Sequence, residues 1–215
     1  MNFLFNLSGA STPVIKEYDI AADTKIFAGE VVGLSDGLIV KANDADSIIG
    51  VCAEDHTGEK DEFNARANGT KVRVNIAPDA VYSAKAPVYA AGNGSTNTTL
   101  VTSSDGLNVS IKSARAVLVS KAENSTNTDM IGSVRKISAV AISGATATIT
   151  LEDGATPCAG DEYVIIPEIG GKLQLKDNGK GVCFYNSATD VQFVLICYDE
   201  KTQCAGVKLA TTIFA

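Results

Sequence analysis

The feature that most constrains the fold is the close spacing of glycine-containing turns between short apolar runs. Residues 26–76 hold four such runs, at 27–34, 38–42, 48–54 and 70–76, and Ser35-Asp36-Gly37 separates the first two. Gly and Asn tolerate the positive φ of tight hairpin turns, and runs of this length are typical of strands. The stretch therefore predicts antiparallel hairpins of a small β-barrel or sandwich.

The same alternation of strands and turns continues along the rest of the chain. A Pro87-Val88-Tyr89 run, a Thr-rich run and an Asp105-Gly106 turn follow, and residues 113–122 form another apolar and β-branched run. In residues 145–151 Thr alternates with Ala, Ile and Leu, which is the pattern of a half-buried strand. We expect no helix longer than two turns. The predicted class is all-β, a small β-barrel or sandwich followed by a second β unit.

The most polar and least periodic segment supplies the expected division into domains. Residues 122–130 read AENSTNTDM and are interpreted as a linker. The expected organisation is an N-terminal arm over 1–18, a β domain over 19–121, this linker, and a C-terminal β domain over 131–215. A chain of 215 residues is long enough to bury a core in one large domain or two small ones.

The N-terminal arm carries four large apolar side chains, Phe3, Leu4, Phe5 and Leu7, followed by a Ser-Gly-Ala-Ser-Thr-Pro connector. Burying each such side chain is worth roughly 1.5–3 kcal/mol, so exposure of all four is unfavourable. We expect them to dock on the protein's own sheet or on a neighbouring molecule. The sequence hypothesis is a docking arm whose removal leaves the β units folded.

Charge and hydropathy exclude two classes of partner. The formal net charge is −7 and the isoelectric point is about 4.7, whereas binding along a nucleic-acid backbone needs clustered Lys and Arg. The N-terminus lacks the basic segment of a signal peptide, and no apolar run is long enough to span a bilayer. We expect a soluble protein made in the cytoplasm, without a nucleic-acid or membrane partner.

One candidate cluster for catalysis or metal binding surrounds the single histidine. His56 lies among acidic residues, Glu54, Asp55, Glu59, Asp61 and Glu62. We expect this to be a solvated surface loop, because a lone histidine in an acidic loop is far more often solvated than catalytic. A cation bound by these carboxylates is the alternative, although the loop lacks the D-x-[DN]-x-[DN]-G spacing that makes calcium binding specific. No G-x-S-x-G nucleophile motif occurs. The sequence predicts no catalytic residue, no metal, no cofactor and no enzymatic activity.

The five cysteines are expected to be reduced and buried. They are an odd number, and no C-x-x-C occurs. Cys183 and Cys197 lie inside apolar runs, where a thiol behaves as a small hydrophobic group. A bridge between Cys197 and Cys204 is the minor alternative.

Four motifs in order resemble the head decoration proteins of tailed bacteriophages. They are A-G-E-V-V at 28–32, the Asp36-Gly37 hairpin, I-I-G-V at 48–51 and G-T-x-V-x-V at 69–74, and a P-V-Y strand followed by a Thr-rich strand extends the resemblance to residues 19–112. The resemblance implies a small β-barrel or tulip-like sandwich that forms homotrimers on the capsid surface of the virion. It also implies that an N-terminal arm, here Phe3 to Leu7, contributes to contact with the major capsid protein. The β unit after Met130 is additional to the smallest of these proteins.

Two other functions stay open from the sequence. One is a carbohydrate- or host-binding head fibre or appendage, which would need exposed aromatic residues at loop tips, although the chain has no Trp. The other is an enzyme on a β-clip scaffold similar to the accessory domains of sugar-acid dehydratases, which share an A-G-E-V-V motif. The single histidine argues against that enzyme.

Overall fold

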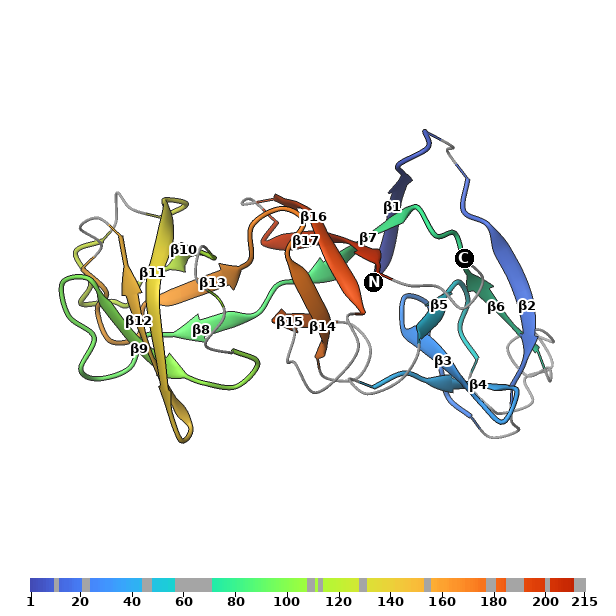
Figure 1. Ribbon diagram of the computed structural model, residues 1–215, viewed down its shortest axis with the longest axis horizontal. Helices are drawn as coiled ribbons and strands as arrows, with labels where there is room; N and C mark the ends of the chain where they lie inside the picture. Colours follow the sequence, from blue (N-terminus) through green and yellow to red (C-terminus); the bar gives the residue numbers. More distant parts are fainter. Residues whose placement is uncertain are drawn as a thin grey trace.

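The computed structural model confirms the all-β prediction (Figure 1). In the part of the chain that it describes, every regular element is a strand, and there are 17 strands in three sheets. The described residues are 1–9, 12–20, 24–43, 48–56, 71–107, 111, 114–127, 131–152, 156–176, 181–184, 192–199 and 202–210.

A closed barrel occupies the middle of the molecule in Figure 1, and the sheet that forms it takes its strands from three distant parts of the chain. Its sheet order is β1-β7-β15-β14-β16-β17, and a further pairing between β7 and β17 closes the last five strands into a barrel. β1 lies outside the closed barrel and pairs antiparallel with β7. The strands are β1 (Asn2–Asn6), β7 (Ala80–Lys85), β14 (Lys172–Lys176), β15 (Gly181–Phe184), β16 (Phe193–Asp199) and β17 (Cys204–Leu209).

The second sheet has the order β8-β13-β10-β11-β12-β9. Its two end strands approach each other, since the Gly92 N–H donates to the Val101 carbonyl at 2.7 Å and the Thr102 hydroxyl donates to the Ala90 carbonyl at 2.7 Å. The predicted Thr alternation is confirmed in β12, where Ala147 and Ile149 are buried. The strands are β8 (Val88–Ala90), β9 (Thr99–Ser103), β10 (Arg115–Ser120), β11 (Val134–Ser143), β12 (Thr146–Leu151) and β13 (Glu162–Ile166).

The third sheet contains the hairpins predicted for residues 26–76, in the order β2-β6-β5-β3-β4. An isolated parallel bridge between Ile20 and Ile39 brings the end strands β2 and β4 together. The predicted turn at Asp36-Gly37 joins β3 and β4, and both residues have positive φ, 50° and 81°. The strands are β2 (Ile15–Asp19), β3 (Val31–Ser35), β4 (Leu38–Lys41), β5 (Ile48–Cys52) and β6 (Lys71–Asn75).

The sheets do not divide at residues 122–130 as the sequence analysis expected. β10 precedes that segment, yet it pairs with β11 and β13, which follow it. The central barrel likewise combines β7 with β14 to β17. The expected units 19–121 and 131–215 therefore do not match the sheets. The chain leaves the central barrel after β1 to form the third sheet, returns through β7, and leaves it again to form the second sheet.

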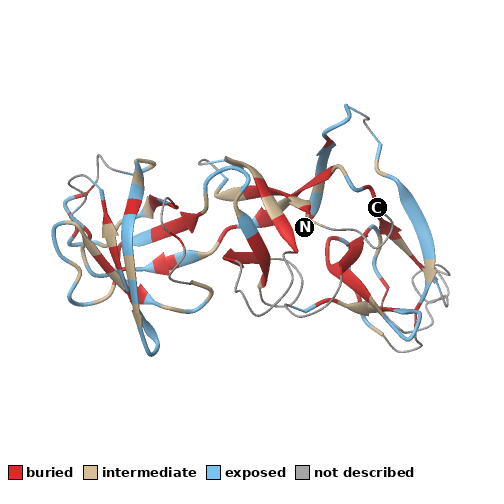
Figure 2. Ribbon diagram, in the orientation of Figure 1, coloured by how far each residue is buried: buried red, intermediate tan, exposed pale blue. Residues whose placement is uncertain are grey.

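The core is light and aliphatic, as the absence of Trp and the small number of aromatic residues predict. Figure 2 shows the buried residues concentrated in the strands of all three sheets. Ile, Val, Leu and Ala supply most buried side chains, and the three largest fully buried ones are Tyr82, Tyr163 and Phe193. Tyr82 and Phe193 belong to the central cluster, and Tyr163 belongs to the cluster of the second sheet.

Candidate interaction surface

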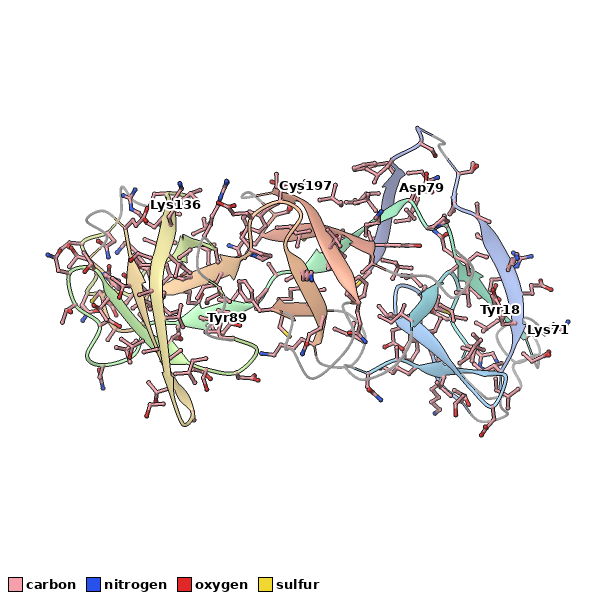
Figure 3. All side chains as sticks on the ribbon, in the orientation of Figure 1. Tyr18, Lys71, Asp79, Tyr89, Lys136 and Cys197 are labelled. Atoms are coloured by element: carbon pink, nitrogen blue, oxygen red, sulfur yellow. The ribbon has the colours of Figure 1, made fainter. Side chains whose placement is uncertain are left out.

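One long antiparallel ribbon connects the central barrel to the third sheet. β1 pairs with β7, and β2 pairs with β6 over five residues. Between these pairs the Leu7 N–H donates to the Asp79 carbonyl at 3.0 Å, and the Ile76 N–H donates to the Val14 carbonyl at 2.9 Å. Figure 3 labels Asp79 beside the end of β1. Residues 2–7 and 14–19 thus run alongside residues 71–83 from one sheet to the other.

An irregularity in β1 determines which of its side chains are buried. Phe3 is opposite Tyr82 and Phe5 is opposite Val81, so Leu4 has no opposite residue in β7. Such a bulge changes the face to which the following side chains point. Phe3 lies edge-on to the ring of Tyr82, with the ring centroids 6.3 Å apart, whereas Leu4 and Phe5 are both exposed.

The four predicted docking residues therefore separate into two groups. Phe3 packs against the central core, while Leu4, Phe5 and Leu7 keep 47%, 43% and 50% of their surface exposed. The N-terminal residues dock on the protein's own sheet, which was one of the two expectations. The predicted arm over 1–18 is thus not free of the β units, since it supplies β1 and most of β2.

Sequence reasoning missed two members of this exposed surface. Val14 and Ile15 are 52% and 45% exposed and follow Leu7 along the same ribbon. Leu4, Phe5, Leu7, Val14 and Ile15 are called the apolar strip below, and Figure 2 shows extensive exposed surface along β1 and β2. In the sequence these two residues follow Pro13 and read as part of the connector. The local sequence does not predict their extended conformation, because it arises from pairing with the distant segment 75–79.

The apolar strip is also electrically neutral. Residues 1–15 contain no Asp, Glu, Lys, Arg or His in a chain of net charge −7. The nearby carboxylate of Asp79 accepts a hydrogen bond from the Ser8 N–H at 3.1 Å, and hydrogen bonds from the Ser8 side chain and backbone lower the pKa of Asp79. The ionised carboxylate therefore already accepts hydrogen bonds from within the ribbon itself.

The structure corrects the interpretation of His56 as a solvated loop residue. His56 is only 2% exposed, its Nδ1 is 2.8 Å from the Thr24 carbonyl O, and its backbone exchanges two hydrogen bonds with Ile26. The acidic neighbours also bind backbone groups, since Asp55 accepts from the Ala28 N–H at 2.8 Å. Within the described residues no group of His, Cys, Asp and Glu side chains has the arrangement of a metal site. Glu59, Asp61 and Glu62 lie outside the described residues.

The five cysteines are all free, but they are not all buried. Cys52 and Cys183 are buried, whereas Cys158, Cys197 and Cys204 are partly exposed. The expected burial of Cys197 is therefore wrong. An irregular register between Leu195 and Cys197 in the pairing of β16 with β17 leaves the second half of β16 partly exposed.

Native thiol labelling should separate these two groups. Burial raises the pKa of Cys52 to about 11, so it carries almost no thiolate at pH 8 and is also hidden from reagents. We expect Cys158, Cys197 and Cys204 to react first with a maleimide, and Cys52 to react only after denaturation. Mass spectrometry of timed labelling reads the order, and rapid native labelling of Cys52 would contradict it.

Two hollows lie near the junction of the central barrel and the second sheet. One, of about 100 Å³, is lined mainly by apolar side chains that include Val134, Ile169 and Tyr198. The other, of about 420 Å³, contains Lys85 and Lys176, and the Lys176 ammonium pairs with the Asp105 carboxylate at 2.7 Å. Of the two lysines that line the larger hollow, Lys176 is therefore already paired with a carboxylate.

The chain matches no protein-family model, no curated protein and no solved structure. Among the described residues, no helix has the length and hydropathy needed to cross a membrane.

Proposed function

We propose that this chain is a structural virion protein that binds the outside of an assembled phage capsid and reinforces or decorates it. The proposed partner is the major capsid protein, and the proposed role is non-enzymatic. The observation that carries the proposal is the apolar strip, a neutral run of exposed large side chains on a segment whose backbone pairs with β7 of the barrel and with residues 75–76 at the third sheet.

The positions of the motifs support the same proposal. In the third sheet, the A-G-E-V-V motif forms the approach to β3 and its first two residues, the D-G pair forms the β3–β4 turn, and I-I-G-V forms most of β5. Residues 71–74 of the G-T-x-V-x-V motif belong to β6, and its first two residues lie outside the described part of the chain. The P-V-Y and Thr-rich runs instead form β8 and β9 of the second sheet. The resemblance to decoration proteins is therefore concentrated in the sheet that continues the ribbon bearing the apolar strip.

The size of the apolar strip favours attachment at many equivalent sites. Large apolar side chains have surfaces of roughly 150–250 Å² each, so five that are about half exposed offer roughly 400–500 Å². That is less than the roughly 800 Å² per partner of a standard stable complex. Linking several copies on one shell makes such weak contacts effective through avidity. The resemblance implies a homotrimer, which the solution mass of the protein would test directly.

Polar substitution within the strip should weaken capsid binding without unfolding the protein. In the double variant L7S/V14S two half-exposed side chains lose most of their apolar surface, and we expect the affinity for assembled heads to fall at least about tenfold. Co-sedimentation with phage heads that lack the protein measures this loss. Circular dichroism should show unchanged strand content.

Ile169→Ser supplies the matched control. Ile169 is 71% exposed but lies outside the apolar strip, so capsid binding should persist in this variant. Equal binding by L7S/V14S and the unmodified chain would contradict the proposed docking surface. Binding of the unmodified chain to a glycan array, with no binding to heads, would instead favour the alternative, a carbohydrate- or host-binding head fibre.

A further inference from the structure

We infer that two copies of this chain form a two-fold dimer by antiparallel pairing of their β1 strands, with Leu4 of each copy opposite Phe5 of the other. The pairing would extend the sheet of one central barrel into that of the second copy. This inference concerns the protein in the absence of a capsid and does not depend on the proposed function.

β1 is an edge strand. It is the terminal strand of its sheet, and among the described strands it pairs only with β7. About half of the backbone N–H and C=O groups of an edge strand point away from its partner and can pair with another strand. Addition of a strand to such an edge is a common mode of association.

The burial pattern of this strand is symmetric. Reading from Asn2 to Leu7, the residues are exposed, inward, exposed, exposed, inward and exposed, where Phe3 and Asn6 are the inward residues. The pattern is symmetric about the midpoint between Leu4 and Phe5, because the bulge places these two neighbours on the exposed side.

That symmetry selects one register. Residues opposite each other in antiparallel strands point to the same face of the sheet. Pairing centred between Leu4 and Phe5 puts Phe3 opposite Asn6 of the second copy. Each inward residue then lies opposite an inward residue, and each exposed residue lies opposite an exposed one. A shift by one residue would put the inward Phe3 opposite the exposed Phe5 of the second copy.

Electrostatic repulsion between two copies is weakest at the β1 edge. Two identical proteins of net charge −7 repel each other, and this repulsion is least where both surfaces are neutral. Residues 1–15 contain no charged side chain, so the β1 edges can approach without facing like charges. A two-fold contact is also self-complementary by nature, because each copy contributes the same patch.

Pairing of this kind would also bring the two apolar strips together. Two strips of roughly 400–500 Å² each would form one patch near the roughly 800 Å² that a standard interface needs from each partner. The dimer thereby gives the proposed capsid contact a larger docking face. It differs from the homotrimer implied by the resemblance, and a mass measurement distinguishes the two.

Analytical ultracentrifugation of the full chain, without capsids, tests the inference. We expect a concentration-dependent equilibrium between one and two copies of the 22.3 kDa chain. Leu4→Lys and Phe5→Glu each place a charge opposite an apolar side chain, so each variant alone should raise the dimer dissociation constant at least about tenfold. Ile169→Lys changes an exposed residue away from β1 and should dimerise normally.

Mixing the two charged variants tests the register. In the inferred pairing, L4K of one copy faces F5E of the other, while the remaining Leu4 and Phe5 pair is unchanged, so the mixture should recover a heterodimer. Recovery that weakens with added salt is the expected result. A monomeric or trimeric unmodified chain, or folded variants that fail to associate when mixed, would overturn the inference. Because no capsid is present, these results test the oligomeric state and do not decide whether the chain binds a capsid.

Discussion

Replacing Asp161 with Ala should lower the free energy of unfolding by about 3–5 kcal/mol, because it removes a fully buried carboxylate and leaves its hydrogen-bond donors without an acceptor. Asp161 is 0% exposed. Its side chain accepts from the Ala122 N–H at 2.9 Å, the Ser125 hydroxyl at 3.1 Å, the Asn127 amide at 2.8 Å and the Cys158 N–H at 3.0 Å. Urea unfolding measures the loss.

Asp105→Asn is the matched control for this substitution. The Asp105 side chain is 75% exposed and pairs with Lys176, so its neutralisation should cost less than about 1 kcal/mol. Equal losses for Asp161→Ala and Asp105→Asn would show that the buried network contributes little to stability.

The same network predicts a dependence of stability on pH. Burial acts to raise the pKa of Asp161, but the hydrogen bonds from Ala122, Asn127, Cys158 and Ser125 outweigh it and lower the pKa below 3.8. Because the pKa of Asp161 is lower in the folded protein than in the unfolded chain, its ionised form stabilises the fold. This stabilisation is complete at pH values above the unfolded-state pKa and is lost as the pH falls through the folded-state pKa. Asp161→Asn should therefore lose less stability than the unmodified chain between pH 5 and pH 3. Parallel urea curves at both pH values would reveal a difference.

This carboxylate explains why residues 122–127, expected to be part of a linker, are instead a loop bonded to the residue that precedes β13. Residues 122–130 are polar and aperiodic, which predicted a linker between two β units. Three of them instead donate to Asp161, a residue more than 30 positions away. Polar loops and linkers have similar compositions, so the sequence could indicate the loop but could not reveal the distant acceptor that fixes it.

The candidate surface was likewise predictable only in part. Hydrophobicity identified Phe3, Leu4, Phe5 and Leu7 as residues that need a partner, because burying large apolar groups is favourable. It could not assign Phe3 to the core and Phe5 to the surface, since residues two apart in a regular strand share a face. The bulge at Leu4 causes this difference, and it depends on the pairing with β7.

Local turn chemistry, in contrast, predicted the strands of the third sheet well. The Asp36-Gly37 turn and the runs at 38–42 and 48–54 correspond to the β3–β4 hairpin, β4 and β5. Hairpins between neighbouring strands depend on residues close in sequence. The closure of the central barrel joins β7 to β17, which are more than 100 residues apart, and no local pattern encodes that contact.

Gly50, in the I-I-G-V motif, should be the glycine of this sheet least tolerant of a side chain. A Cβ at this position would lie 2.6 Å from Cγ1 of Val74 and still closer to the Asn75 carbonyl O, so β5 and β6 would have to move apart. Because packed interiors adjust little, we expect Gly50→Ala to reduce the free energy of unfolding by about 3 kcal/mol. Urea unfolding followed by circular dichroism measures this loss.

Gly181→Ala provides the comparison that isolates the steric effect. Gly181 also lies in a strand, but a Cβ there would be 3.5 Å from the Lys176 carbonyl O, an ordinary contact. Alanine also reduces the freedom of the unfolded chain, so this variant should change stability by less than about 1 kcal/mol in either direction. If Gly50→Ala is as stable as Gly181→Ala, β5 and β6 do not approach each other as closely as the structure places them. If only Gly50→Ala is destabilised, the motif's glycine is required by the proximity of these two strands rather than by turn formation.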